Sequence, residues 1–432
     1  MFKMKLLKND IKGNVLLLIF SFVAVFTRPL MGVYFLNFRL GEWLILIGLI
    51  LSVFGSIIYY KKHEFAKYHF YLVLSFLLLV FLFSEASFLN PYVYKSSSYI
   101  WSIGFVYIGI YFANNTPTSI FLNFLILIPI LLYLFSTGNY PNIVIDFFQN
   151  YSDKFQYPKA SDILIVLISI NLILKTKIKQ KSYVYLFSST TGLFLPLLIF
   201  QSRGAALALV VYLLIEISIN LKYFISFKRI LFISISVFLI LFSISSLRIA
   251  DNYKLIEIEE EVLISYQEVT SSVTEIITKK ETLQTFLSFY FENNRLVSTD
   301  PTTNWRLDIW QDVYFDFKEE AKLLKGYGYL ETIPVMLDPT APGRLGKDGL
   351  NEHVHNIFIT SLSRGGFLHL IIYILFFISL FLEKFKYLNL TSFPLVIPAY
   401  LNSFFDIGLD GVQFPFVFFF TLGYLITISK RK

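Results

Sequence analysis

The chain has 432 residues and is 56% hydrophobic but only 16% charged, with a mean hydropathy of +0.63. Soluble domains carry about 25% charged residues, so this composition excludes an ordinary water-soluble protein. The sequence has 0 cysteines, which excludes disulfides, thiolate metal sites and cysteine nucleophiles, while its net charge of +7 raises the question of nucleic-acid binding.

Apolar runs long enough to cross a membrane recur from one end of the chain to the other. The hydrocarbon core of a bilayer is about 30 Å thick and requires about 20 apolar residues per helix. We therefore predict an all-α, polytopic membrane protein with about 12 transmembrane helices. The expected spans are residues 14–27, 43–60, 68–85, 98–113, 118–137, 161–175, 183–200, 205–221, 230–247, 357–382, 390–405 and 413–429.

The placement of charge predicts how these spans are oriented. With the N-terminus in the cytoplasm, the cytoplasmic segments hold 19 of the 37 basic residues against three acids. The opposite orientation would place this basic excess outside, against the positive-inside rule. We therefore predict a multi-pass protein of the bacterial inner membrane, surrounded by membrane lipids, with both termini cytoplasmic. The basic character is an orientation signal, so no nucleic-acid partner is expected.

One long polar stretch divides the chain into three parts. Residues 1–248 hold the first nine predicted spans, residues 249–355 form a large extracytoplasmic loop, and residues 356–432 hold the last three spans. A loop of this length is too long for an unstructured connector inside a compact protein. We expect it to be partly helical and to pack over the membrane domain.

The two halves of this loop have different patterns. Residues 251–292 mix Glu and Lys with apolar residues at helical spacing, which is typical of a helix on a membrane surface or of a lid. Residues 304–325 predict a second helix, with Trp305, Ile309 and Val313 on one stripe. The glycine- and proline-rich residues 326–349 cannot form a regular helix.

Arg203 lies in a tight turn, Gln201–Gly204, between the seventh and eighth predicted spans. A guanidinium group is costly to dehydrate at the membrane edge, and its planar fork of donors suits a phosphate group. The structural alternative is an arginine that reaches out to the interface or pairs with an acid. The residues alone leave both interpretations open.

His355 lies where the loop meets the tenth predicted span, in Glu352-His353-Val354-His355-Asn356. Histidine is the usual general base near neutral pH, and it also binds metals. His353 and His355 could chelate zinc on a strand, but no cysteine and no third clustered ligand supports a metal site, so none is expected. Helix capping or interfacial anchoring is the structural alternative, and Asn356 could orient the imidazole or contact a sugar hydroxyl.

Arg306 lies between Trp305 and Trp310 in the loop. Aromatic faces often bind carbohydrate, and arginine often binds phosphate, so this pattern is compatible with a phosphosugar ligand, but by itself it favours a structural role. The alternative is a structural ion pair with a nearby acid such as Asp308 or Asp312.

Four other charged residues are weaker candidates. Arg344 lies in the glycine- and proline-rich stretch, and Arg364 lies near the start of the tenth predicted span. Asp406 and Asp410 follow the eleventh span. These two aspartates could be acids of a site, but we expect both of them to be solvated loop residues.

Taken in order, these motifs resemble those of the O-antigen ligase/polymerase superfamily. The resemblance covers about residues 184–390 and rests on Ser202–Ala205 between two spans, Trp305–Trp310 and Gly326–Gly328 in the external loop, and His355-Asn356 followed by Gly366. The next family glycine position holds His369 in this chain.

The resemblance implies a metal-independent, inverting membrane glycosyltransferase without a cofactor. Its donor would be a glycan on undecaprenyl diphosphate, and its acceptor a sugar or lipid hydroxyl. Arg203 and Arg306 would bind the diphosphate, and His355 would be the general base. The remaining candidates for supporting or acceptor-binding roles are His353, Asn356, Trp305, Arg344 and Arg364.

Three functions remain open at this stage. A ligase would transfer the glycan to a surface acceptor, whereas a polymerase would use a second lipid-linked repeat unit as acceptor. A transporter or flippase of lipid-linked oligosaccharide is the alternative from another class. Transporters carry polar residues near the middle of the membrane on repeated helices, but here the candidates lie at the external rim and no internal repeat is found.

Overall fold

The computed structural model describes residues 2–83, 88, 90–115, 119–155, 157–226, 228–256, 288–319, 322–349, 351–383, 387–388 and 391–430. Most of these residues are helical. The first part of the chain contains α1 Phe2–Met31, α2 Leu40–Tyr59, α3 Glu64–Phe83, α4 Pro91–Ser96, α5 Ser98–Trp101, η1 Ser102–Gly104, α6 Phe105–Asn114, α7 Ser119–Ser136, α8 Asn142–Tyr151, α9 Ala160–Lys175, α10 Gln180–Gln201, α11 Arg203–Ser226 and α12 Lys228–Ile256. The second part contains α15 Pro301–Glu319, η2 Pro334–Leu337, α16 Leu345–Asp348, α17 Ile357–Phe381, α18 Phe393–Ser403, η3 Gly408–Asp410 and α19 Gln413–Ser429.

The strands of the described residues form three antiparallel hairpins. They pair β1 Tyr34–Phe35 with β2 Phe38–Arg39, β3 Phe289–Glu292 with β4 Arg295–Ser298, and β5 Leu382–Glu383 with β6 Tyr387–Leu388. The longest, β3–β4, pairs Phe289 with Ser298 at one end and Glu292 with Arg295 at the other. A strand at 289–292 corrects the expectation that residues 251–292 are helical throughout. Residues 257–287 of that predicted lid lie outside the described part of the chain.

Seven helices within the described residues are long and apolar enough to cross a membrane, by length and composition. They are Ile11–Met31, Leu40–Tyr59, Glu64–Phe81, Gln180–Gln201, Arg203–Leu221, Lys228–Ala250 and Ile357–Phe381. Each overlaps one predicted span. The protein is therefore a mostly helical membrane protein, as the composition indicates.

The other five predicted spans coincide with shorter helices, and their passage through the membrane stays a prediction. One of them, residues 98–113, is broken into α5, η1 and α6. The break follows from close packing: Ser52 of α2 donates a hydrogen bond to the carbonyl oxygen of Trp101 at 3.0 Å. A Cβ on Gly104 would lie 2.3 Å from the carbonyl oxygen of Gly48, so no larger residue fits there.

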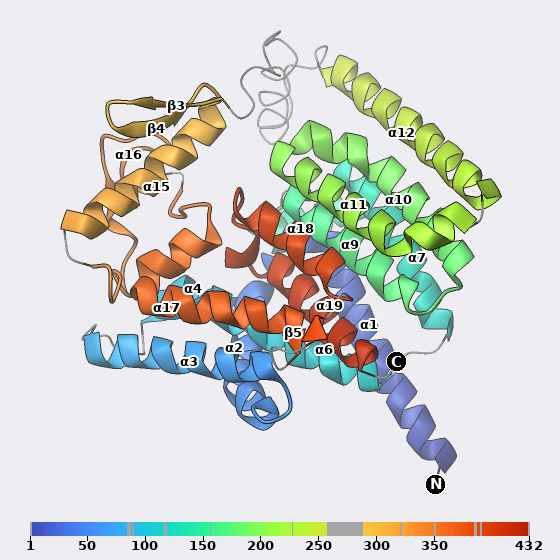
Figure 1. Ribbon diagram of the computed structural model, residues 1–432, viewed down its shortest axis with the longest axis horizontal. Helices are drawn as coiled ribbons and strands as arrows, with labels where there is room; N and C mark the ends of the chain where they lie inside the picture. Colours follow the sequence, from blue (N-terminus) through green and yellow to red (C-terminus); the bar gives the residue numbers. More distant parts are fainter. Residues whose placement is uncertain are drawn as a thin grey trace.

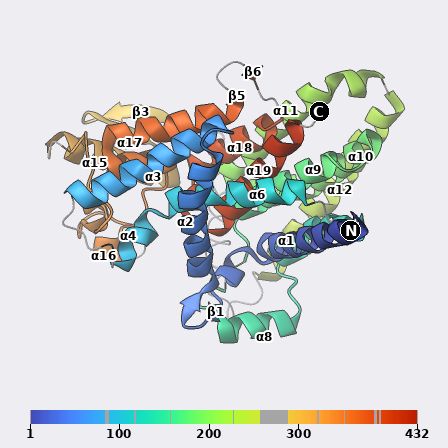
Figure 2. The same cartoon turned by 90° about the horizontal axis from the view of Figure 1, so that it is seen from below.

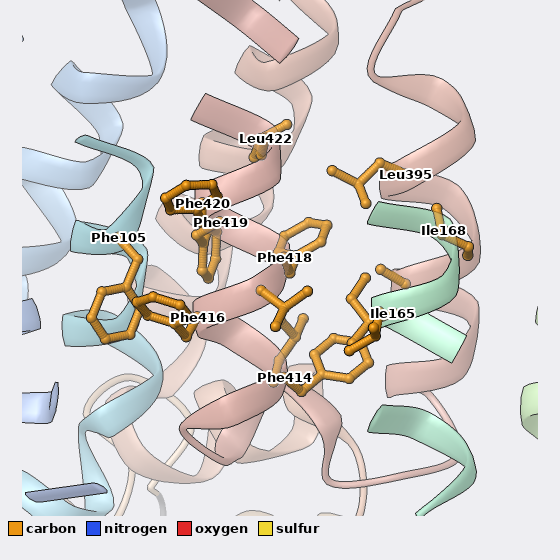
Figure 3. Packing of buried hydrophobic residues seen from close by; sticks show 14 of the residues in the cluster. Phe105, Ile165, Ile168, Leu395, Phe414, Phe416, Phe418, Phe419, Phe420 and Leu422 are labelled. Atoms are coloured by element: carbon orange, nitrogen blue, oxygen red, sulfur yellow. The ribbon is translucent and has the colours of Figure 1, made fainter. Parts of the chain in front are cut away.

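The core of the bundle is built around α9 and α19, which are buried on all sides over almost their whole lengths. Figure 3 shows the phenylalanines of α19 packed between α6 and the side chains of α9 and α18. The rings of Phe105 and Phe416 meet edge to face, with centroids 5.0 Å apart. Gly109 and Gly423 let α6 and α19 approach closely, because a Cβ on either would lie within about 2 Å of a carbonyl oxygen of the other helix. A central helix of this kind is apolar all round rather than on one stripe.

The described part of the long loop has a small hydrophobic core of its own. Ile309, Val313 and Phe317 of α15 are buried in it, and Trp305 packs against its edge. This confirms the predicted stripe, although α15 begins at Pro301 and ends at Glu319 rather than spanning 304–325. Figures 1 and 2 show this subdomain beside the beginning of α17 and next to α3 and α4. We call this side of the molecule the loop face.

The loop is joined to the bundle through a break in α17. Gly366 has φ +70° and interrupts the helix. The carbonyl oxygens of Ser363 and Arg364, released by the break, accept hydrogen bonds from the backbone N–H groups of Tyr327 and Gly328 at 2.8 and 3.0 Å. The Gly-Tyr-Gly segment of the loop therefore supplies the donors that the broken helix lacks.

We expect Gly366→Ala to destabilise the protein more than Gly349→Ala. Both glycines have φ near +70°, which costs a residue with a Cβ about 1–2 kcal/mol. A Cβ on Gly366 would also lie 2.2 Å from the carbonyl oxygen of Leu324, whereas nothing lies within 4 Å of a Cβ on Gly349. This overpacking adds about 1–3 kcal/mol. The measurement is the apparent unfolding temperature of both variants in detergent at one scan rate, and equal losses would contradict the docking of the loop on α17.

Candidate functional site

Arg203, Arg306 and His355 are brought together on the loop face by one helix, α15. Arg203 is the first residue of α11 and donates a hydrogen bond to Asp300, just before α15, at 2.9 Å. Arg306 lies on α15 itself, and the indole of Trp305 on the same helix meets the imidazole of His355 at a centroid distance of 5.1 Å. Asp300 and Arg306 are six residues apart, which is about 9 Å along a helix axis.

Asp300 connects the start of α15 to Arg203 of α11, and it was not among the site residues predicted from the sequence. One carboxylate oxygen accepts hydrogen bonds from the backbone N–H and the hydroxyl of Thr303, at 2.9 and 2.6 Å, and so caps α15. The other oxygen binds Arg203. Partial burial favours the neutral acid, but the bonds from Thr303 and the charge of Arg203 hold the pKa of Asp300 below its ordinary value. Asp300 followed by Pro301 is a typical helix start, and this was the signal available in the sequence.

Arg306 lacks the structural partners that the sequence suggested for it. Asp308 and Asp312 bind two other arginines, Arg295 and Arg344. Arg306 forms no ion pair with a described residue, and its buried Nε has no hydrogen-bond partner. Burial lowers the pKa of the Arg306 guanidinium, although the carboxylates of Asp406 and Asp300 act to raise it. A half-buried cation without an acidic partner among the described residues is the feature expected of a group that binds an anionic ligand.

His355 combines backbone strain, burial and a neutral side chain. Its φ of +54° is in the left-handed region that residues other than glycine rarely adopt. Its Nδ1 is buried without a hydrogen-bond partner. Burial, followed by the charge of Arg306, lowers the pKa of His355 to about 3, while Asp406 acts in the opposite direction. The imidazole is therefore neutral near pH 7.

Asn356 holds the start of α17 in place. Its side-chain oxygen accepts hydrogen bonds from the backbone N–H groups of Phe358 and Ile359, at 3.0 and 3.2 Å. Its side-chain amide donates to the carbonyl oxygen of Phe404 at 3.5 Å. With 4% of its surface exposed, Asn356 fixes the direction in which the chain leaves His355.

His353 has different neighbours from His355, although the two residues are close in sequence. Its Nε2 lies 3.6 Å from a carboxylate oxygen of Glu352, which also pairs with Lys95 of α4. Burial lowers the pKa of His353 to about 4, against the effect of the Glu352 charge. His353 lines a small pocket that includes Arg364 and Asp410.

Arg344 and Arg364 both make structural contacts. Arg344 is 1% exposed and binds Asp308 and Asp312 at 2.8 and 2.5 Å, so it belongs to the ion-pair network of the loop subdomain. Arg364, on α17, donates to the backbone carbonyl oxygens of Gly328 and Glu331. It therefore reinforces the docking of the loop on the broken helix.

Asp410 differs from the solvated acid that the sequence suggested. One of its carboxylate oxygens accepts a hydrogen bond from the hydroxyl of Thr360 at 3.1 Å, and the other is buried without a partner. Burial raises the pKa of Asp410 to about 7, against the hydrogen bond from Thr360 and the charge of Arg364. Asp406 acts electrostatically on both Arg306 and His355, so its carboxylate lies near these two residues. The position of Asp406 and Asp410 in a loop after an apolar span did not predict the surroundings of either carboxylate.

The arrangement combines the groups needed for acid–base chemistry next to an anion. Arg203, paired with Asp300, and Arg306 are two cations whose donors suit phosphate oxygens, and His355 is a neutral imidazole close to Arg306. The indole of Trp305 forms one wall at His355. Such a site can bind a phosphorylated leaving group and remove a proton from an attacking hydroxyl.

The comparison with protein families agrees with the position of these residues. Residues 189–374 match the family model described as O-antigen ligase, and this range contains Arg203, Arg306 and His355. No significant match to a curated protein is found. This match covers less than half of the chain, and over this central part the chain is similar to the O-antigen ligase family.

Proposed function

We propose that the protein is an O-antigen ligase-like glycosyltransferase of the bacterial inner membrane. It transfers a glycan from undecaprenyl diphosphate to a hydroxyl of a surface glycan or lipid acceptor, at the extracytoplasmic face. The observation that carries this proposal is Arg306, a half-buried cation without an anionic partner among the described residues, next to the neutral imidazole of His355. The family match over residues 189–374 supports the same chemistry.

In the proposed reaction the acceptor oxygen attacks the anomeric carbon of the donor glycan. The new bond joins that oxygen to the anomeric carbon, and the bond from the anomeric carbon to the phosphate oxygen breaks. The proton of the acceptor hydroxyl passes to His355, and undecaprenyl diphosphate leaves with its negative charge bound by Arg203 and Arg306. A single displacement of this kind inverts the configuration at the anomeric carbon. Fixed cations stabilise the leaving group in the role that a divalent metal fills in other transferases.

We expect Arg203→Ala, Arg306→Ala and His355→Ala each to abolish most of the transfer activity. Removal of the base costs about 10²–10⁴-fold, and removal of one cation that binds the developing charge costs about 10²–10³-fold. The measurement is glycan transfer by purified protein with a lipid-linked glycan donor. Lys318→Ala is the matched control, because Lys318 is an exposed cation on the same helix, α15. Full activity of both Arg203→Ala and His355→Ala would disprove the mechanism.

The lowered pKa of His355 predicts a pH profile without an acidic limb near pH 6.5. An ordinary histidine base loses activity as the pH falls through 6.5, because it becomes protonated. With a pKa of about 3, His355 stays neutral from pH 5 to pH 8. We expect kcat/KM, which reports the free enzyme, to change less than about threefold over this range. The unfolding temperature at each pH serves as the control for stability, and a tenfold loss per pH unit below 6.5 in folded protein would refute the assignment.

The polymerase is the second candidate, and the presence of His369 at a family glycine position keeps it open. The two functions share the donor site and differ in the acceptor. Gene deletion separates them by the glycan that remains. For a ligase we expect loss of surface-attached glycan while long polymer accumulates on the lipid carrier. Surface glycan reduced to single repeat units would assign the polymerase instead.

A further inference from the structure

A basic pocket lies far from His355, at the other end of α17. It is a cavity of about 340 Å³ between the turn that joins α2 to α3 and the C-terminal ends of α17 and α19. Its walls include Lys61, Lys62 and Lys67 from the turn and the first part of α3, Ser379 of α17, and Lys430 after α19. Figures 1 and 2 show α3 and α17 side by side along their lengths. The positive-inside distribution predicts that this end faces the cytoplasm.

The charge of the cavity is strongly positive. Its lining contains four lysines and one acid, Glu64. Glu64 is already paired with Lys67 at 2.9 Å. Lys61 and Lys62 form no ion pair with a described residue, and the Lys62 ammonium lies 5.5 Å from the ring centroid of Tyr59. The concave shape and the net charge of +3 fit an anion with more than one oxygen.

The surface next to the cavity is apolar. On α2, Phe54, Ile57 and Ile58 are 62%, 56% and 62% exposed, and they lie within two turns of Lys61. On α3, Tyr71 and Leu74 are also exposed. Both helices meet the length and composition criteria for a membrane span. A ligand held by the lysines therefore has an apolar helix surface directly beside it, towards the bilayer.

We propose that this cavity binds the phosphate headgroup of an anionic phospholipid from the cytoplasmic leaflet. The lysines contact the phosphate oxygens, and the acyl chains lie along the exposed faces of α2 and α3. Basic pockets between transmembrane helices on this side of a membrane suit such headgroups. A soluble phosphate would use the lysines but not the apolar surface, so charge and surface together favour a lipid. The bound lipid joins the cytoplasmic ends of α3, α17 and α19.

The test compares the full-length protein with a pocket variant, Lys61→Gln/Lys62→Gln, and a control variant, Lys179→Gln/Lys181→Gln. Lys179 and Lys181 are exposed lysines at the start of α10, outside the cavity. Each protein is placed in nanodiscs of phosphatidylcholine alone or with phosphatidylglycerol. The readouts are the apparent unfolding temperature and the number of phosphatidylglycerol molecules retained in native mass spectrometry. A parallel series adds inorganic phosphate to protein in phosphatidylcholine.

We expect phosphatidylglycerol to raise the unfolding temperature of the wild-type protein and the control variant by about 2–4 °C, and the pocket variant to lose most of this rise. The pocket variant also retains less phosphatidylglycerol than the control. Equal losses in the two variants would show a diffuse charge effect and overturn the proposal. A full rise with inorganic phosphate alone would exclude the lipid. The test does not depend on glycosyl transfer, so it stands or fails separately from the proposed function.

Discussion

The structure depends on how the break in α17 is satisfied. A backbone carbonyl without a donor is costly in an apolar environment, so a helix cannot be interrupted unless another segment supplies hydrogen bonds. Here the interruption at Gly366 is met by the N–H groups of Tyr327 and Gly328. Arg364 strengthens the same junction through the carbonyl oxygens of Gly328 and Glu331. The loop is therefore fixed to the bundle by backbone bonds in a defined register, rather than by surface contacts alone.

The ion pairs of the loop subdomain leave one arginine of the candidate site without an acidic partner among the described residues. The loop subdomain uses Asp308 and Asp312 to neutralise Arg295 and Arg344, and these four charges form a closed network. Arg306, on the same helix, is left outside that network. A half-buried cation without an ionic partner among the described residues is unfavourable for folding, and the proposed function supplies it with an anionic ligand. The lowered pKa of His355 follows partly from the same uncompensated charge.

Much of this arrangement follows from the sequence because it depends on long, simple patterns. Apolar runs predict about 12 spans, of which seven overlap helices that meet the span criteria, and the stripe on α15 is confirmed with its buried residues. The chemical identities of Arg203, Arg306 and His355 mark them as candidates, but no pattern predicts that α15 brings them together. The break between α5 and α6 depends on contacts with α2 that only the folded bundle reveals. The hairpin β3–β4 was missed because its first strand, residues 289–292, was included in the helical pattern of residues 251–292.

The acids of the site were the least predictable part, because a carboxylate in a loop looks solvated until its surroundings are known. Asp300 serves both as a helix cap and as the partner of Arg203. Asp410 has a buried oxygen without a partner, although it lies in a short turn between two apolar helices. Arg203 and Thr360, which bind these two acids, are distant in sequence, so the local pattern indicates only that Asp300 could cap α15.

His369, which the resemblance places at a family glycine position, is held by contacts from other parts of the chain. Its Nδ1 lies 2.8 Å from the hydroxyl of Ser75, and its Nε2 lies 2.9 Å from the hydroxyl of Tyr99 and 3.3 Å from that of Tyr329. Tyr329 belongs to the loop, so this cluster joins the loop to α3, α5 and α17 just beyond the break. Both ring nitrogens of this buried imidazole have hydrogen-bond partners, as most buried polar groups do. The contacts of His369 thus assign it to the anchoring of the loop rather than to the cluster around His355, and the difference between ligase and polymerase has to be sought at the acceptor side of the site.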